Sequence, residues 1–416
     1  MKQQDRQILA VAGAAALLMA ITMGSRSAFG LFVSPLNTAT GLGVITISFA
    51  GAVNQLLWGA AQPVVGALAD RHGAARVIAV GGLVLALGTA LIPFAHSGAT
   101  LVLAFSLIAI AGAATGSNGL LLGVVSRQAS AQRRGLAIGV VGAGGSAGQL
   151  VLTPGTQEAI SAAGWVAAMF GLAALALLAV PLALAFRPAT RAAAIDSTCP
   201  ADSRALRTAL ASRAFWCLAG GFFVCGFHVA FLISHMPGVI ALCGMPAGMA
   251  GQWLAIVGLC NMVGSIAAGA AIRRGSMRRL LILLYLLRAL GVGLFIVLPK
   301  TEGLMLAFAA WMGLTYMATL PPTAGLVGKL FGLQRMATLL GVVMLVHQLG
   351  AFLGVWLGGI ALALQGGYDW VWYADVALAL LAAAIHLPLR EREGANGPAP
   401  APLFVSPGSA VRPQLS

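Results

Sequence analysis

Residues 121–141 read LLGVVSRQASAQRRGLAIGVV, and residues 323–343 read TAGLVGKLFGLQRMATLLGVV. Sliding the chain on itself by 202 residues superposes the two stretches, and Arg127 then meets Lys329. The positions that meet an identical residue are Gly123, Val125, Gln132, Arg133, Gly139, Val140 and Val141. A match at a fixed offset of about half the chain indicates an internal duplication. We therefore expect two similar halves, each containing one copy of this segment.

The composition places both halves in a membrane. Of the 416 residues, 60% are hydrophobic and 8% are charged, a balance that soluble domains do not need to fill a core. Roughly 20 apolar residues span the hydrocarbon core. Such runs predict helices near residues 8–33, 44–68, 76–95, 100–125, 135–154, 164–186, 214–240, 249–272, 279–299, 303–328, 336–364 and 370–389. The predicted fold is all-α, with twelve transmembrane helices in two pseudo-symmetric six-helix bundles.

The domain boundaries follow from the breaks in this apolar rhythm. Residues 188–213 are polar and charged, which is typical of a cytoplasmic linker between the halves. We assign residues 1–187 to the N-terminal half and residues 214–390 to the C-terminal half. Residues 391–416, rich in Pro, Ala and Ser, predict a disordered cytoplasmic tail.

The net charge of +14 could indicate nucleic-acid binding, but the positions of the basic residues indicate membrane topology instead. With the N-terminus inside, the cytoplasmic segments hold 21 of the 24 Lys and Arg residues, and the opposite side holds only Lys300. Basic loops remain in the cytoplasm because they are hard to translocate. We therefore predict a multi-pass protein of the bacterial inner membrane, with both termini cytoplasmic and no nucleic-acid partner.

The loop between the second and third predicted helices contains GALADRHGAARV, residues 66–77. This motif resembles the loop signature of the major facilitator superfamily, and it implies a cytoplasmic latch. In that latch, glycines would form tight turns, an acid would sit against a helix N-terminus, and arginines would remain in water. The latch residues are Gly66, Asp70, Arg71, Gly73 and Arg76.

The equivalent stretch of the second half, GAAIRRGSMRRL at residues 269–280, has Arg273 where an acid is expected. A second latch would therefore lack its carboxylate.

Three further stretches resemble the bacterial relatives of monocarboxylate and oxalate/formate carriers. They are SRSAFGLFVSPL (25–36), CGFHVAFLISHMPGVI (225–240) and HQLGAFLGVWLGG (347–359). The resemblance implies an alternating-access carrier for small organic acids. It also implies an acid and an arginine on the eighth helix of proton-coupled members, where this chain has Asn261 and Ser265. Protons therefore stay open as the coupling ion.

Ionisable side chains within spans are costly and are candidates for function. Arg26 lies about 27 Å along the first helix, and it could bind a carboxylate through a fork of two hydrogen bonds. The alternative is an arginine that snorkels to the outer interface. His347 lies about 17 Å along the eleventh helix, where it could bind an anion, carry a proton or form part of the core. His228 on the seventh helix is a further cavity candidate.

Other polar groups have two interpretations each. Asn118, Gln149 and Tyr316 lie on helices that line the cavity in this superfamily, and each could orient a substrate or serve helix packing. Arg288 and Asp375 lie on helices that are peripheral in this architecture. We expect Arg288 to cap carbonyls or to pair within the C-terminal half, and the role of Asp375 is open.

These features predict a secondary transporter, not an enzyme. Gly144, Ser146 and Gly148 fit the GxSxG pattern of hydrolases, but they lie in an apolar helix without the strand-turn-helix elbow. No P-loop, metal site or cofactor motif is apparent. The predicted function is transport of a small organic anion, a monocarboxylate, by a monomer. The alternatives are efflux of lipophilic drugs and a membrane sensor that transports nothing. Substrate, direction and coupling ion are left open.

Overall fold

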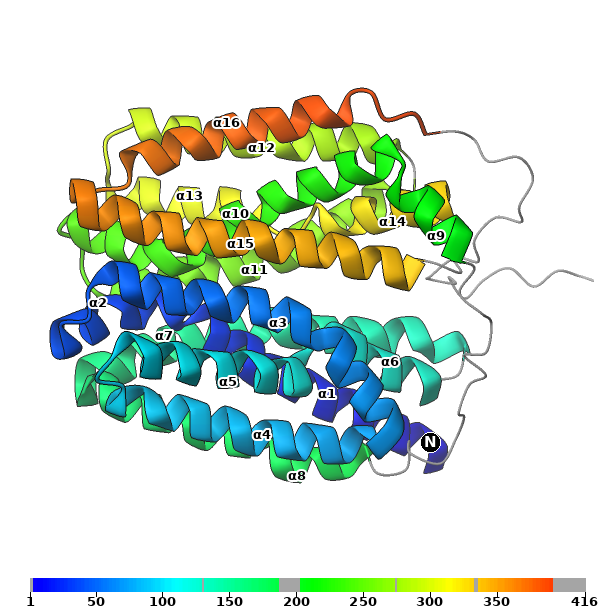
Figure 1. Ribbon diagram of the computed structural model, residues 1–416, viewed down its shortest axis with the longest axis horizontal. Coiled ribbons are helices and arrows are strands. Elements are labelled where there is room, and N and C mark those ends of the chain that lie inside the picture. Colours follow the sequence, from blue (N-terminus) through cyan, green and yellow to red (C-terminus); the bar gives the residue numbers. More distant parts are fainter. Residues whose placement is uncertain (1–2, 129–130, 187–202, 274, 333–335, 392–416) are drawn as a thin grey trace, which may run out of the picture.

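The computed structural model describes residues 3–128, 131–186, 203–273, 275–332 and 336–391, and the regular elements within these ranges are all helical (Figure 1). The helices of the N-terminal half are α1 (Gln3–Ser27), α2 (Phe29–Thr40), α3 (Val44–His72), α4 (Ala74–Leu91), η1 (Ile92–Phe94), α5 (Gly98–Gly116), α6 (Asn118–Gln128), α7 (Ala131–Leu177) and α8 (Ala179–Ala183).

The C-terminal half forms a second bundle beside the first (Figure 1). Its helices are α10 (Arg213–Leu242), α11 (Gly248–Ala271), α12 (Met277–Val297), α13 (Glu302–Thr315), α14 (Leu320–Phe331), α15 (Met336–Gln365) and α16 (Asp369–His386). The short helix α9 (Ser203–Leu210) precedes it, in the segment predicted to be the linker. The predicted tail beyond Glu391 lies outside the described residues.

The number of membrane crossings agrees with the prediction. Eleven stretches of the described chain are long and apolar enough to cross a membrane. One of them, Ala137–Phe186, has 50 residues, which at 1.5 Å per residue would be about 75 Å and more than twice the hydrocarbon thickness. Gly164 interrupts it with a φ of 82°, in the left-handed region that favours glycine. This stretch therefore supplies two crossings, and the total is twelve.

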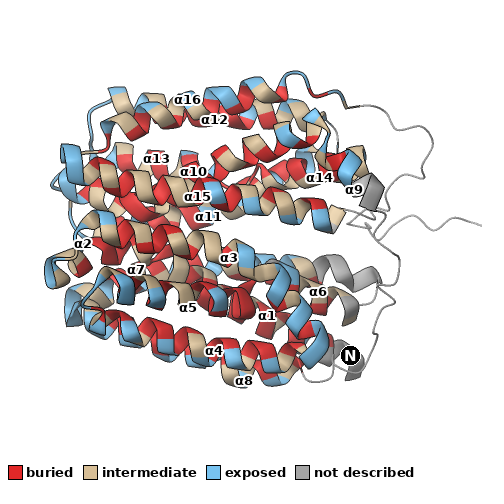
Figure 2. Cartoon of the chain, in the orientation of Figure 1, coloured by how far each residue is buried: buried red, intermediate tan, exposed pale blue. Residues whose placement is uncertain are grey.

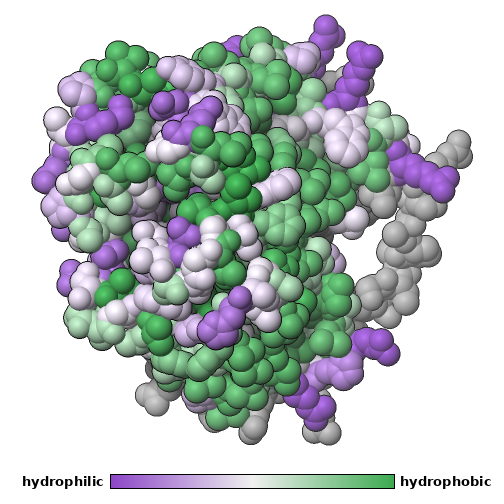
Figure 3. Space-filling model, turned by 60° about the vertical axis from the view of Figure 1, so that its left-hand side comes forward, coloured by the Kyte–Doolittle hydropathy of each residue, from purple (hydrophilic) through white to green (hydrophobic). Residues whose placement is uncertain are grey.

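The outer surface has the apolar composition expected of a surface that faces lipid. Buried residues concentrate between the helices of each bundle (Figure 2). Large apolar side chains such as Val151, Ile266 and Val297 are nevertheless exposed, and Figure 3 shows a broad hydrophobic surface bordered by hydrophilic residues. Exposed apolar area of this extent indicates a non-aqueous surrounding.

The duplication is visible in how the helices pack. In the N-terminal half α7 lies against α1, and a Cβ on Gly148 would come within 2.0 Å of the Ala20 carbonyl oxygen. In the C-terminal half α15 lies against α10, and a Cβ on Gly350 would come within 2.0 Å of the Phe223 carbonyl oxygen. Gly148 and Gly350 are 202 residues apart, so they are equivalent in the duplication. The GxSxG pattern therefore belongs to a packed helix, as glycine-mediated packing requires.

Besides the break at Leu178 between α7 and α8, three crossings of the described chain are broken, which frees backbone groups inside the protein. The first breaks at Ala28, between α1 and α2, and the fourth at Ser117, between α5 and α6. The tenth breaks at residues 316–319, before the two prolines that open α14. Proline lacks the N–H that continues a helix, so it is tolerated at this first turn. Non-helical backbone at membrane depth persists only where protein or water satisfies it.

The two halves meet through α3 and α15, through α7 and α11, and through α2 and α10. Phe49, near the start of α3, packs edge-on against Trp356 with ring centres 5.5 Å apart. Three hydrogen bonds also join the halves: Gln149 Nε2 to Leu254 O (3.1 Å), Thr153 Oγ1 to Gly251 O (3.4 Å) and Gln348 Nε2 to Gln55 O (2.8 Å). These contacts lie from the middle of the helices toward the end that carries Gly164, which is the predicted periplasmic side.

Candidate functional site

Arg26 lies in the last turn of α1, beside the break at Ala28. Its guanidinium is half-buried and donates a hydrogen bond from Nη2 to Oε1 of Gln55 on α3. The guanidinium carbon also lies 4.4 Å from the ring centre of Trp58, a cation–π contact. Both partners are neutral, and no carboxylate of the described residues pairs with Arg26. The positive charge is therefore available to an anion.

Tyr316 comes from the other half and lies at the break between α13 and α14. Its side chain is buried, and its hydroxyl has no hydrogen-bond partner among the described residues. A buried tyrosine hydroxyl normally has one. The side chain is near enough to Arg26 for the two to interact electrostatically. Arg26 and Tyr316 are thus polar candidates from the two halves that lie within electrostatic range of each other.

A largely apolar cavity adjoins Arg26 inside the N-terminal half. Asn54 closes part of its wall, where Nδ2 donates to the Phe105 carbonyl at 2.8 Å. The cavity is lined by Thr22, Ser25, Arg26, Phe29, Phe32, Gly51, Asn54, Gln55, Trp58, Leu85, Thr89, Ile92, Phe105, Ile108, Met169, Leu172 and Ala176. Such a lining suits the apolar part of a ligand whose charged group is held by Arg26.

Two side chains hold the break that carries Tyr316. Arg288 on α12 donates from Nη2 to the carbonyl oxygens of Thr315 and Tyr316, which confirms the expected capping role. Asn261 on α11 accepts a hydrogen bond from the backbone N–H of Met317 at 3.1 Å. The sequence alone did not reveal this role of Asn261, because nothing in an apolar run shows which neighbouring helix is broken.

His347 lies next to the residue that bridges the halves. Its Nδ1 is 3.1 Å from Oε1 of Gln348, and its ring centre is 4.8 Å from that of Phe222. Its Nε2 is buried without a hydrogen-bond partner among the described residues. Cys225 on α10 is a further neighbour. His347 therefore lies beside a contact between the halves, and its hydrogen-bond and ring neighbours are neutral.

His228 lies beside an acid of a neighbouring helix. Its Nδ1 lies 2.7 Å from Oδ1 of Asp375 on α16, and the two side chains are 1% and 0% exposed. A role of His228 in the substrate cavity stays a prediction. Asp375, whose role the sequence left open, is the acid that lies beside His228.

The other polar candidates are resolved in part. Gln149 serves packing between the halves, since its amide nitrogen donates to the Leu254 carbonyl. Asn118 is the first residue of α6, and its side chain lies outside the described residues. His235, two turns after His228, is buried with Nε2 2.8 Å from the Val355 carbonyl.

The first cytoplasmic latch has only part of its expected geometry. Gly73 joins α3 to α4 with a φ of 89°, as a tight turn requires. Gly66 instead lies inside α3, because this helix continues to His72. Asp70 is exposed and has no hydrogen bond or ion pair to any described residue. Arg71 and Arg76 are exposed, as predicted.

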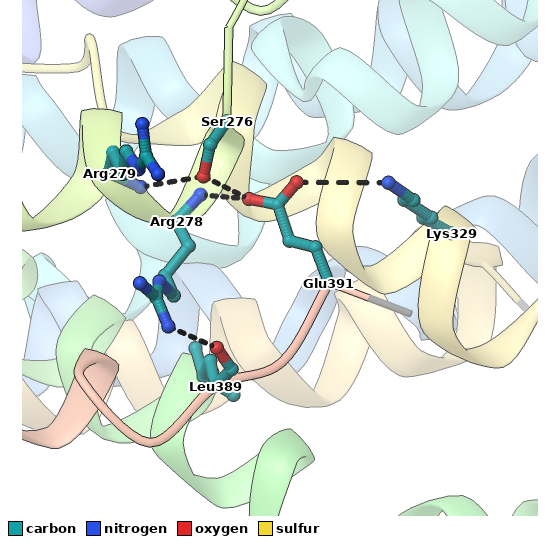
Figure 4. Close-up of polar contacts among 6 residues, drawn as sticks. All are labelled: Ser276, Arg278, Arg279, Lys329, Leu389 and Glu391. Carbon is teal, nitrogen blue, oxygen red and sulfur yellow. Dashed lines mark hydrogen bonds and ion pairs between the residues drawn. The ribbon is translucent and has the colours of Figure 1, made fainter. Parts of the chain in front are cut away.

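The second latch does have a carboxylate, supplied from elsewhere in the chain (Figure 4). Glu391, just after α16, accepts hydrogen bonds from Ser276 Oγ at 2.7 Å and from the Arg278 backbone N–H at 2.6 Å. Lys329 at the end of α14 forms an ion pair with it at 3.7 Å. Burial alone would raise the pKa of Glu391, but these hydrogen bonds and the positive charges of Lys329 and Arg278 hold its pKa below the usual range. We call Ser276, Arg278, Lys329 and Glu391 the C-half clamp.

Comparison with known proteins identifies the family. The model of the Major Facilitator Superfamily matches residues 15–355 and 276–414. Monocarboxylate transporter 11 of Mus musculus is 30% identical over 72% of this chain and 69% of its own length. An uncharacterized MFS-type transporter of Bacillus subtilis is 24% identical over 91% of this chain and 95% of its own length.

A crystal structure of a bacterial homolog of the human lysosomal transporter Spinster, inward-facing and occupied, has the same fold. Its TM-score is 0.72 at 16% identity, and the match covers 93% of this chain and 97% of that one. Twelve crossings, an internal duplication and a site shared by two bundles agree with these matches. This chain belongs to the major facilitator superfamily.

Proposed function

We propose that the chain is a secondary active transporter that moves a small organic anion, most suitably a monocarboxylate, across a bacterial inner membrane by alternating access. The observation that carries the proposal is the half-buried guanidinium of Arg26, which has no carboxylate partner among the described residues. An unbalanced positive charge in a low-dielectric site favours an anion. The relatives named monocarboxylate transporters support the same class of substrate.

The proposed binding mode uses both halves. The guanidinium of Arg26 would donate two parallel hydrogen bonds to the carboxylate. The unpartnered hydroxyl of Tyr316 would donate a third from the C-terminal half. The rest of the substrate would occupy the apolar cavity beside Arg26. A ligand that contacts both bundles changes the relative stability of their inward-facing and outward-facing arrangements when it binds, as alternating access requires.

The alternatives have less support. A pump for lipophilic cations needs an acid at the binding site, and the buried acid in the described spans, Asp375, is paired with His228 away from Arg26. In a membrane sensor that transports nothing, the uncompensated positive charge of Arg26 would have no evident function. Neither alternative explains the combination of Arg26 with the unpartnered hydroxyl of Tyr316.

The test is uptake by vesicles that contain the purified protein. Labelled acetate, lactate, pyruvate and benzoate are offered in turn, and each acid then competes with its own amide for the best-transported label. Acids should compete and amides should not, because only the acid carries the charge that Arg26 recognises. Equal competition by acid and amide, or strong transport of a lipophilic cation, would overturn the anion proposal. No uptake of any compound would favour the sensor.

A further inference from the structure

We propose that His228 and Asp375 form a buried proton-binding site whose occupancy is linked to the anion at Arg26; this rests on the proposed function. The two side chains approach from α10 and α16, with Nδ1 2.7 Å from Oδ1, and both are buried. None of the four polar atoms of the pair, His228 Nδ1 and Nε2 and Asp375 Oδ1 and Oδ2, has a hydrogen-bond partner within the described residues. The two side chains are therefore held together by the close approach of Nδ1 to Oδ1, and Nε2 and Oδ2 have unused hydrogen-bonding capacity.

The chemistry of the pair suits one exchangeable proton. In the neutral imidazole with its hydrogen on Nδ1, Nε2 presents a lone pair. A proton added there converts the imidazole into an imidazolium beside a carboxylate, and loss of the same proton restores the starting pair. Asp375 supplies the counter-charge without which a buried imidazolium would be too costly. Histidine is the side chain that changes charge most readily near neutral pH.

Among the ionisable groups of the neighbouring helices, the pair of His228 and Asp375 is the best suited to bind a proton. On α12, Arg288 is near enough to interact electrostatically with Asp375. The other ionisable groups on the described helices packed around the pair are Arg213, Cys217, Cys225 and His235 on α10, Arg278, Arg279 and Tyr285 on α12, His347 on α15, and Asp369, Tyr373 and His386 on α16, with Tyr316 at the break. The adjoining α11 adds only Cys260, and α2 adds none. None of these histidines has a carboxylate beside it, whereas His228 does.

Arg288 links the pair to the anion site. Its Nη2 holds the carbonyl oxygens of Thr315 and Tyr316, while its charge acts on Asp375. In this proposal, Arg288 would therefore transmit a change in charge at the pair to the backbone that positions Tyr316.

The charge balance predicts the sign of the linkage. Apart from Arg278, which lies at the end of α12 beside Glu391, the buried or half-buried charges within the described spans are Arg26 and Arg288 against Asp375, so two positive charges minus one negative give +1. A proton on His228 would make this +2 in the empty protein but +1 when a monocarboxylate is bound. Like charges repel strongly at low dielectric, so the anion favours the proton. By reciprocity the proton favours the anion equally.

The experiment compares two transport modes in vesicles, using the monocarboxylate that the wild type transports best. One mode is uptake driven by an imposed pH gradient, and the other is exchange of labelled for unlabelled acid without a gradient. His228→Gln and Asp375→Asn should keep exchange and lose the response to the gradient. The matched control is His235→Gln, which removes an equally buried histidine of the same helix and should keep both modes. The exchanged pair, His228→Asp with Asp375→His, should regain the gradient response.

A second measurement does not depend on how the variants fold. Addition of the acid to weakly buffered wild-type protein should withdraw protons from solution, as a pH-sensitive dye would show. A wild type that exchanges the acid but takes up no proton would overturn this inference alone, as would gradient-driven uptake that survives in His228→Gln. A wild type that moves no carboxylate in either mode would overturn the proposed function and this inference with it.

Discussion

A few residues determine the chemistry that this membrane protein can perform, and Arg26 is the chief of them. Its neighbours Gln55 and Trp58 orient the guanidinium without neutralising it. Other polar side chains in the spans support a broken helix, as Arg288 and Asn261 do. Arg26 differs from them because it lines a cavity and is not paired with any described carboxylate.

Replacing Arg26 should weaken substrate binding in a graded way. Arg26→Ala removes a charge-assisted hydrogen bond worth about 1.5 to 3 kcal/mol, which corresponds to roughly tenfold to hundredfold weaker binding. Arg26→Lys keeps the charge but loses the fork, so its affinity should lie between those of Arg26→Ala and the wild type. Competition by unlabelled acid measures the affinities. Equal affinity in the wild type and Arg26→Ala would show that the arginine does not contact the substrate.

Glycine packing gives a second prediction at this scale. A Cβ at position 148 would lie 2.0 Å from the Ala20 carbonyl oxygen, whereas nothing lies within 4 Å of a Cβ at position 139 of the same helix. Gly148→Ala should therefore destabilise the protein by about 1 to 3 kcal/mol, the usual cost of overpacking. Gly139→Ala is the control and should be neutral. Unfolding temperatures of the purified variants test this, and an unchanged temperature for Gly148→Ala would contradict the packing.

At the scale of elements, the C-half clamp ties three helix ends together. Glu391 follows α16, Ser276 caps α12, and Lys329 lies in the last turn of α14. By contrast, Asp70 of the first latch is exposed without a partner among the described residues. The two halves thus differ at their predicted cytoplasmic ends, and the clamp stabilises only the C-terminal bundle.

The clamp should depend on pH in a defined direction. Because the folded-state pKa of Glu391 is lowered, its contribution is present above the unfolded pKa and is lost as pH falls through the folded value. Glu391→Gln should lower the unfolding temperature at neutral pH, and the gap to the wild type should close below about pH 4. For this partly exposed cluster we expect about 1 kcal/mol. Glu302→Gln, at an exposed helix start, is the control; a gap of constant size at all pH values would contradict the clamp.

The elements also show how far sequence reasoning extends. The spans were predictable because apolar runs of membrane length have few alternatives, and the duplication was predictable from one repeated segment. The breaks at Ser117 and at residues 316–319 were not, since the apolar runs continue across them. The partnership of His228 with Asp375 could not be predicted either, because it depends on which helices are neighbours. Glu391 was assigned to the tail because its partners lie more than sixty residues away in sequence.

At the scale of the whole molecule, two bundles meet through α3 and α15, through α7 and α11, and through α2 and α10. Their contacts extend from the middle toward the end that carries Gly164. If that end faces the periplasm, the described contacts between the two bundles lie on the outer side and at the middle of the membrane.

The topology is testable with reporter fusions. The segregation of basic residues predicts that reporters after Ser97, Gly164 and Gly367 lie in the periplasm. Reporters after Gly73 and Ser276 should lie in the cytoplasm. Alkaline phosphatase is active only outside and a fluorescent protein only inside, so each position gives two independent results. Two positions on the wrong side would contradict the orientation.

Counterflow tests the central claim, that this protein is an alternating-access carrier of organic anions, most directly. Vesicles that contain the protein are loaded with unlabelled monocarboxylate and diluted into a trace of the labelled acid, with no ion gradient. In a carrier, the binding site returns to the outer side with unlabelled acid bound and then brings labelled acid in. The label should therefore rise inside above its external level for a time, and this overshoot should shrink in Arg26→Ala. Entry of label only to the equilibrium level, at the same rate in loaded and empty vesicles, would contradict the account.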